Sequence, residues 1–189
     1  MENSVIKAIL ERRSVRSFKP DPVAQEEMEL IIEAGLWAPS AINLQPTHIM
    51  VVVGQEKIAA LNSQVKSASQ EAPFDRYRSV VSNPKYSINF NSAPLFFVVG
   101  TDREKSPCLV EDGTCVLLNI LLAAHSLGLG GCWINQLGAI SEEPSFRAYL
   151  TSLGFPTTHK IVGSAAIGHP SKTSHPAPKR RPGRTNIVR

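Results

Sequence analysis

A nearly uninterrupted apolar run in the second half of the chain limits what this sequence can fold into. Between residues 115 and 127 the run is broken only by Asn119, His125 and Ser126. A helix that is apolar on almost every face is a buried helix, and this run is too short and too interrupted to span a bilayer. Asp112, which lies just before it, is a residue type that commonly caps the start of a helix. We therefore expect a buried central helix that begins at Asp112 and ends near residue 127.

Glycines separate this helix from a short apolar segment, residues 132–134, which predicts a strand. Gly128 suits the position that follows a helix C-terminus. Gly130 and Gly131 would let the backbone come close to something flat or bulky, although a tight turn is the plainer alternative. The order of helix, glycines and strand is the reverse of the order in dinucleotide-binding fingerprints. A glycine-lined sheet edge therefore follows the central helix.

The remaining apolar segments predict a single α+β domain, a size that 189 residues allow. Their periodicity predicts helices over residues 4–13, 21–37, 56–66 and 144–153, and strands over residues 48–54, 94–101 and 160–168. Residues 67–92 are polar, contain Pro73 and Pro84 and have no clear period. Long irregular segments in compact domains are commonly lids or binding loops, so this one is a candidate covering loop.

The net charge of +4 comes from the end of the chain. Residues 172–189 contain no acidic residue and six basic ones, which are Lys172, Lys179, Arg180, Arg181, Arg184 and Arg189. Without these six the chain has 14 basic and 16 acidic residues. A basic tail on a mildly acidic body favours a local anionic target over general nucleic-acid binding.

Common catalytic and metal-binding patterns are missing from the sequence. The histidines show no HExxH spacing, and neither a GxSxG motif nor a Walker A loop is present. The three cysteines, Cys108, Cys115 and Cys132, form no CxxC pair. We expect no metal site, reduced thiols and, since no signal sequence or membrane span is recognisable, a cytoplasmic protein. An enzyme of this kind would take its chemistry from an organic cofactor.

Arginines are concentrated where the first predicted helix ends. Arg12, Arg13, Ser14 and Arg16 place three guanidinium groups and a hydroxyl within five residues. Guanidinium groups suit the bidentate geometry of a phosphate. Arginines at a helix C-terminus also complement the helix dipole, so a solvated helix end is the alternative.

Five short motifs, in order along the chain, resemble the FMN-dependent nitroreductase family. They are RRSVRSF at 12–18, APSAINLQP at 38–46, LGLGGCWI at 127–134, GHP at 168–170 and PKRRP at 178–182. Each motif alone is loose, whereas their common order covers nearly the whole chain. The resemblance implies an α+β fold with three layers, in which helices flank a mixed, mainly antiparallel sheet.

The resemblance also implies site residues. Those that would hold the phosphate and ribityl chain of FMN are Arg12, Arg13, Ser14 and Arg16, joined by Lys179 and Arg181 from the tail. Those that would line the flavin ring are Pro39, Ser40, Ala41, Asn43 and Gln45, with Gly130, Gly131 and Cys132 passing over it through backbone groups. The alternatives are a disordered solubilising tail and, for the loop, a turn whose side chains bond their own backbone. Cys132 is expected to be a small buried apolar residue and not a redox thiol.

Members of this family are intertwined homodimers, so an apolar outer face of the central helix would meet its twin. Residues 170–189 would then reach the partner subunit, where Ile187 and Val188 could pair as an added strand. The implied activity is electron transfer from NADH or NADPH through FMN to a small nitroaromatic or quinone acceptor, by a ping-pong mechanism without a catalytic side chain. Alternatives are a reductive dehalogenase, a dehydrogenase, a flavin-fragmenting enzyme or a flavin-binding protein without turnover. Because the tail has no aromatic residue, binding to nucleic acid is disfavoured.

Overall fold

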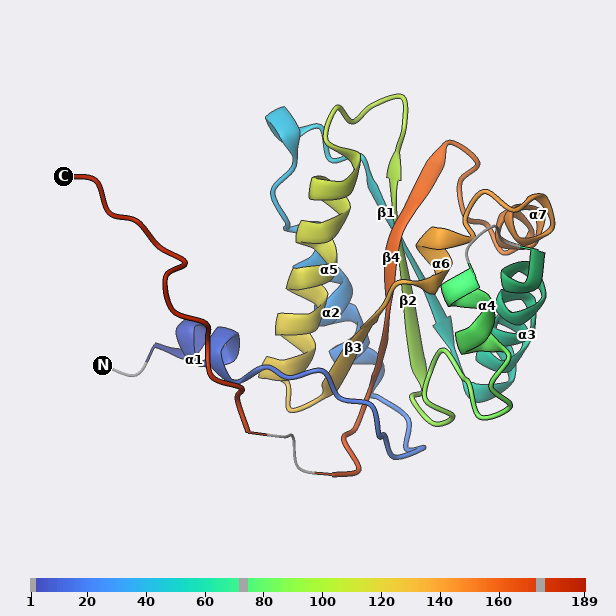
Figure 1. Ribbon diagram of the computed structural model, residues 1–189, viewed down its shortest axis with the longest axis horizontal. Coiled ribbons are helices and arrows are strands. Elements are labelled where there is room, and N and C mark those ends of the chain that lie inside the picture. The colour runs from blue at the N-terminus through green and yellow to red at the C-terminus, as the bar shows by residue number, and fades with distance from the viewer. Residues whose placement is uncertain (1–2, 72–74, 173–175) are drawn as a thin grey trace.

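Four strands form the middle layer of the molecule, and helices cover both faces of the sheet (Figure 1). The computed structural model describes residues 3–71, 75–172 and 176–189, and the side chains of all of these except 71 and 75–77. The helices are α1 (Ser4–Glu11), α2 (Gln25–Leu36), η1 (Ala41–Asn43), α3 (Gln55–Glu71), α4 (Asp75–Val81), α5 (Leu109–Ser126), α6 (Gln136–Ala139) and α7 (Pro144–Ser152). The strands are β1 (Thr47–Val53), β2 (Leu95–Asp102), β3 (Gly130–Ile134) and β4 (His159–Gly168). The three-layer α+β prediction is confirmed.

The sheet has the strand order β1-β2-β4-β3, and all three pairings are antiparallel. Every residue of β2 is buried, because helices cover both of its faces. Successive side chains of a strand point to opposite faces. Phe96 and Val98 accordingly belong to one core with α3, α6 and α7, whereas Phe97 and Val99 belong to the other core with α2 and α5. The runs at 94–101 and 160–168 are the buried strands that they predicted. The run at 48–54, predicted as a buried strand, forms β1, which is half-buried at the sheet edge with Val52 buried and Val53 exposed.

The central helix α5 begins at Leu109, earlier than predicted, and Cys108 is its N-cap. Asp112 is therefore not a cap but a buried residue inside the first turns of the helix. The expectation that α5 is buried on every side is also wrong for one protomer, since Leu118 is 48% exposed on its outward face. By length and hydropathy α5 would be able to cross a membrane, but its other faces pack on the sheet and on α2, as in a core helix.

Two helices begin differently from the sequence prediction. Asn3, and not Ser4, caps α1, because its side-chain oxygen accepts the backbone N–H groups of Val5 and Ile6. The second helix begins at Gln25, after Ala24 at the N-cap position, and not at 21–22. The carbonyl of Pro22 instead bonds the ring of His169 at 3.2 Å. Residues 19–22 are therefore bound to the end of β4 and cannot join the helix.

Residues 67–92 are more regular than the sequence predicted. Helix α3 continues to Glu71, and α4 covers Asp75–Val81, whereas residues 72–74 of the range lie outside the described residues. The part that lacks long regular structure runs from 82 to 92. The short helix α6 was not predicted either, because four residues are too few to show a helical period.

The segment that follows α1 lies along the sheet edge at β3. Ser14 forms an isolated parallel bridge with Gly131, and the Val15 N–H donates to the carbonyl of Gly131 at 3.1 Å. Further on, Phe18 forms an antiparallel bridge with Pro170. Within the described residues, the Ser14 bridge is the parallel element of an otherwise antiparallel sheet. It brings the arginine-rich segment against the two glycines that begin β3.

Candidate functional site

Three of the predicted phosphate-binding residues gather around Cys132. In an extended segment alternate side chains share a face, and Arg12, Ser14 and Arg16 are alternate residues. Burial raises the pKa of the Cys132 thiol, while the guanidinium groups of Arg16 and Arg12 and a hydrogen bond from Ser14 act in the opposite direction. A buried thiol with a raised pKa is a packing residue and not a reactive nucleophile, as the sequence indicated. Because the neutral thiol does not compete for them, the guanidinium groups of Arg12 and Arg16 are available to bind an anion beside β3.

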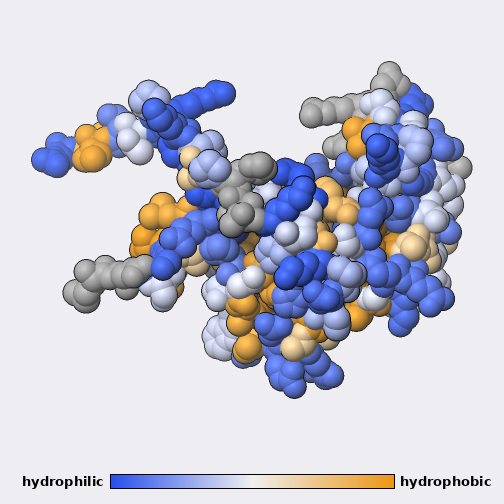
Figure 2. Space-filling view, turned by 90° about the horizontal axis from the view of Figure 1, so that it is seen from below, coloured by the Kyte–Doolittle hydropathy of each residue, from blue (hydrophilic) through white to orange (hydrophobic). Residues whose placement is uncertain are grey.

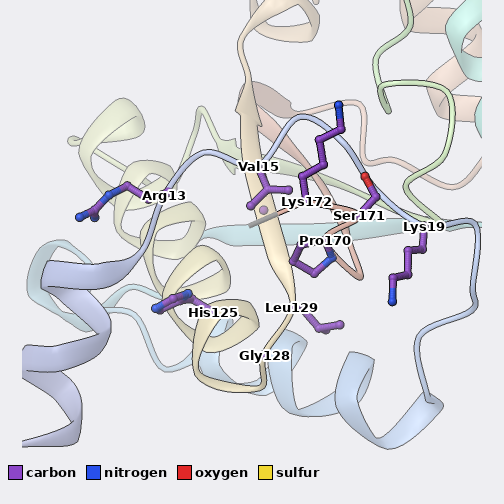
Figure 3. A pocket seen from close by; sticks show the side chains of 10 residues that line it. Arg13, Val15, Lys19, His125, Gly128, Leu129, Pro170, Ser171 and Lys172 are labelled. Atoms are coloured by element: carbon purple, nitrogen blue, oxygen red, sulfur yellow. The ribbon is translucent and has the colours of Figure 1, made fainter. Parts of the chain in front are cut away.

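Arg13 lies on the opposite face of the segment. Its Nη1 donates to the carbonyls of Leu10 and Arg12, each at 2.7 Å, so it binds the backbone where α1 ends. Arg13 also borders a cavity of about 450 Å³ together with His125 and Lys19. Figure 3 shows that the charged ends of Arg13, Lys19 and Lys172 point in different directions. This cavity has positive charge at its rim but no converging donors.

A second cavity, of about 490 Å³, lies on the Arg16 face. Arg16 and Cys132 line one side, and Tyr86 and Phe90 supply aromatic walls on another. The Tyr86 hydroxyl is buried and has no hydrogen-bond partner, and burial raises its pKa. Lys85 adds a second cation, and none of the described residues that line the cavity is acidic. We call this space the Arg16 cavity. It combines an aromatic wall with positive charge, which suits an anionic aromatic ligand.

Gly130 and Gly131 are explained by packing within the chain. A Cβ atom at Gly130 would lie 2.8 Å from side-chain atoms of Val15, and one at Gly131 would lie 2.7 Å from Leu121. The glycines therefore allow the arginine-rich segment and α5 to approach β3. Gly128, with φ of +78°, ends α5 as predicted, its N–H donating to the His125 carbonyl at 3.0 Å.

The predicted flavin-ring loop, residues 38–46, is a strained and exposed turn. Ile42, Asn43 and Gln45 have φ values of 42°, 58° and 49°, in the left-handed region that favours glycine. The Ser40 hydroxyl accepts the Gln45 N–H at 2.9 Å, and Gln45 Nε2 donates to Asn43 Oδ1 at 3.2 Å. The predicted alternative, a turn that bonds its own groups, is thus present in part. Pro39, Asn43 and Gln45 are exposed, and Ser40 and Ala41 are half-buried.

The two halves of the predicted site lie at opposite ends of α5 (Figure 1). Ala41 is bonded to Asp112 in the first turns of the helix, whereas Arg13 and Gly131 border a cavity with His125 in its last turn. Thirteen residues of α-helix separate Asp112 from His125 and span about 20 Å. One protomer therefore does not bring the loop and the arginine-rich segment to the same ligand.

The tail residues predicted to bind phosphate are also not assembled within one protomer. Lys179 and Arg181 are exposed, as are all residues from 176 to 189. The tail projects from the body on the side of α1 (Figure 1). Its start is fixed, since the Ser171 N–H donates to the Ser17 carbonyl at 3.0 Å.

The sequence missed two contributors. Asp112 looked like a helix cap, and only the fold reveals that it bonds a residue 71 positions away. Tyr86 lies in a segment without periodicity, and no local signal marks it as part of a cavity wall. An aromatic residue next to Lys85 in the proposed covering loop was the available hint.

Comparison with known proteins gives the family. Residues 9–169 match the Nitroreductase family, and the chain belongs to it. The chain is 53% identical to the NADH dehydrogenase of Thermus thermophilus, over 90% of this chain and 88% of that protein. It is 30% identical to the NADPH-flavin oxidoreductase of Vibrio harveyi, over 94% of this chain and 70% of that protein. A nitroreductase of Bacteroides fragilis, whose crystal structure contains bound FMN, superposes with a TM-score of 0.92 at 33% identity and full coverage of both chains.

Proposed function

We propose that this protein is an FMN-dependent oxidoreductase that passes electrons from NADH or NADPH to a small organic acceptor of the nitroaromatic or quinone type. The observation that carries the proposal is the Arg16 cavity, where cations that pair with no carboxylate among the described residues meet aromatic walls at the edge of β3. The similarity to flavin oxidoreductases and to an FMN-containing nitroreductase supports the same cofactor. Bound FMN would supply the electron transfer, and no side chain need act as a base.

The chain's own residues would hold the cofactor. Arg12, Ser14 and Arg16 are placed to bind its anionic phosphate and ribityl chain, because they share one face and no carboxylate among the described residues pairs with them. The backbone of Gly130, Gly131 and Cys132 would pass along the ring. Arg13 would act indirectly, by fixing the end of α1.

A homodimer would complete the site. In a two-fold dimer with antiparallel α5 helices, the start of each helix meets the end of its twin. The loop of one copy, with Pro39, Ser40, Ala41, Asn43 and Gln45, would then reach the flavin held by the arginines of the other. Lys179 and Arg181 would join the phosphate once the tail is ordered against a partner.

Exposed apolar side chains support this dimer. Apolar side chains that are about half exposed or more, on α1, α2 and α5 or directly after α2, include Val5, Ile6, Ile9, Leu10, Leu36, Trp37, Val110 and Leu118. Figure 2 shows apolar surface over α1 and again near the end of the tail, where Ile187 and Val188 are 76% and 89% exposed. Monomeric proteins rarely expose apolar patches of this extent, so burial of these side chains against a second copy of the chain would explain them.

The segment that ends at residue 92 would restrict access to the flavin. Lys85, Ser87 and Asn91 lie on the wall of the Arg16 cavity, where they would face a bound flavin. Cysteines 108, 115 and 132 are all free thiols, which is typical of a reducing compartment and supports a cytoplasmic location.

The test is direct. Purified protein should be yellow, release FMN on denaturation, and lose its flavin absorbance when NADH or NADPH is added without oxygen. A nitroaromatic compound or a quinone should then restore the absorbance. A colourless protein that does not take up added FMN would contradict the proposal, and a flavin that neither nucleotide bleaches would contradict the enzymatic part of it.

A further inference from the structure

A buried carboxylate fastens the exposed loop 38–46 to the core. Asp112 is 4% exposed, and its Oδ1 accepts the backbone N–H of Ala41 at 3.0 Å. Its Oδ2 accepts the hydroxyl of Ser106 at 2.6 Å, and the Ser106 oxygen accepts the N–H of Cys108 at 2.9 Å. Both carboxylate oxygens are thus used, one to organise the turn before α5 and the other to hold a distant loop.

The bond to Ala41 lies where the loop needs support. Ala41 begins the short helix η1, and the next two residues, Ile42 and Asn43, have left-handed backbones. Ile42 is β-branched and 88% exposed, so neither its conformation nor its environment is favourable by itself. Strained backbone of this kind persists only where its surroundings fix it, and it clusters at functional sites. Backbone bonds hold the two ends of the loop, where Ala38 donates to the Gly35 carbonyl and the Pro46 carbonyl accepts the Asp102 N–H. Between these ends, the Asp112 bond is the tie from outside the loop among the described residues.

We propose that Asp112 is a positioning residue, which holds the loop 38–46 in the strained conformation that meets the flavin of the partner subunit. The inference rests on the proposed function, because it assigns a purpose to the loop only if the loop lines a flavin. Asp112 touches neither cofactor nor acceptor. It acts through Ala41, and its position inside α5 ties the loop to the helix that forms the proposed dimer interface.

A purely structural role makes a different prediction. If Asp112 served only to organise the turn from Ser106 to Cys108, its loss would lower thermal stability but leave the loop as it was. A positioning role requires that the loop loosen and that FMN bind more weakly, even in the protein that remains folded.

Hydrogen exchange of the cofactor-free protein and FMN titration separate the two roles. In Asp112→Ala, the backbone amides of residues 41–45 should exchange at least tenfold faster, and the FMN dissociation constant should rise about tenfold. Asp112→Asn keeps an oxygen that can accept the Ala41 N–H, so both quantities should stay within about threefold of the unsubstituted protein. Glu111→Ala is the matched control, since it removes an exposed carboxylate one residue away and should change neither.

Ala41→Pro removes the same hydrogen bond from the loop side. Ser40 has an extended backbone, with φ of −136° and ψ of 159°, which is the conformation that a following proline requires. This variant leaves the core intact and should loosen the loop and weaken FMN binding in the same direction. It therefore decides the question if Asp112→Ala does not fold.

Unchanged FMN affinity together with unchanged exchange, at 41–45 in Asp112→Ala or at 42–45 in Ala41→Pro, where residue 41 has no amide proton, would overturn the inference. Equal damage from Asp112→Asn and Asp112→Ala would also overturn it, because charge and not the hydrogen bond would then matter. Failure of the unsubstituted protein to bind FMN would instead reject the proposed function. The exchange experiment would still report, in that event, whether Asp112 holds the loop.

Discussion

Replacing Arg16 by alanine should weaken FMN binding without unfolding the protein. Arg16 is exposed, lines its cavity beside Cys132, and pairs with no carboxylate in the described part of the chain. Its removal breaks no hydrogen bond or ion pair within the described residues, so the free energy of unfolding should change by no more than about 0.5 kcal/mol. A hydrogen bond to a charged group contributes about 1.5–3 kcal/mol, which corresponds to an FMN dissociation constant about 10- to 100-fold higher.

Arg13→Ala is the matched control for Arg16→Ala. Arg13 has the same side chain three residues earlier, but its guanidinium is bonded to the carbonyls of Leu10 and Arg12. Its loss should lower the free energy of unfolding by about 1 kcal/mol and leave FMN affinity within about threefold. Flavin fluorescence titration gives the FMN dissociation constant of each variant, and chemical denaturation gives its free energy of unfolding. The reasoning is refuted if Arg13→Ala weakens FMN binding as much as Arg16→Ala, or if Arg16→Ala binds FMN normally.

Two further predictions concern the dimer and the pH dependence of stability. Leu118→Glu places a charge on the outward face of α5 and should convert the proposed dimer to monomers that lose FMN, as measured by size-exclusion chromatography. Leu153→Glu, at a similar exposure of 45% directly after α7, should leave the oligomeric state unchanged. Dimers that survive Leu118→Glu would argue against an α5 interface. Burial lowers the pKa of both His48 and His159, whose rings lie 5.9 Å apart, although Asp102 opposes the shift at His159. As the pH falls, the histidines of the unfolded chain therefore take up protons at a higher pH than those of the folded chain. The free energy of unfolding should fall as the pH drops below the ordinary histidine pKa of about 6.5. His48→Gln should make that decline shallower in denaturation curves recorded between about pH 5 and 7, and an equally steep decline would show that His48 is not its source.

The sequence predicted the sheet well because buried strands have a strong signal. The apolar runs at 48–54, 94–101 and 160–168 fall within one residue of β1, β2 and β4 at both ends. The central strands β2 and β4 are covered on both faces and must be largely apolar, and few other elements of that length are. The edge strand β1 has the same apolar signal although it is only half-buried. Helix starts were harder to predict. Asp and Pro at 21–22 form a good local start signal, yet His169 from the far end of the chain binds Pro22 and shifts the start to Gln25.

The site could be predicted as a set of motifs but not as an arrangement. The alternation that sends Arg12 and Arg16 to one face and Arg13 to the other depends on pairing with β3, which the motif does not reveal. Asp112 matched a cap rule that considers only neighbouring residues, whereas its partners are Ser106 and a loop residue 71 positions away. Long-range contacts of this kind follow from the fold and produce no periodic pattern of residues in the sequence.

The central claim is that each flavin is held by the arginine-rich segment of one copy and the loop 38–46 of the other. Dimers assembled from one copy with Arg16→Ala and one with Asn43→Ala and Gln45→Ala test it, provided that each variant alone binds FMN weakly. If the site is shared between copies, such a heterodimer has one intact site and one doubly altered site. The account predicts one FMN per heterodimer, bound with the affinity of the unsubstituted protein. Two equally weakened sites and no site of full affinity would contradict it.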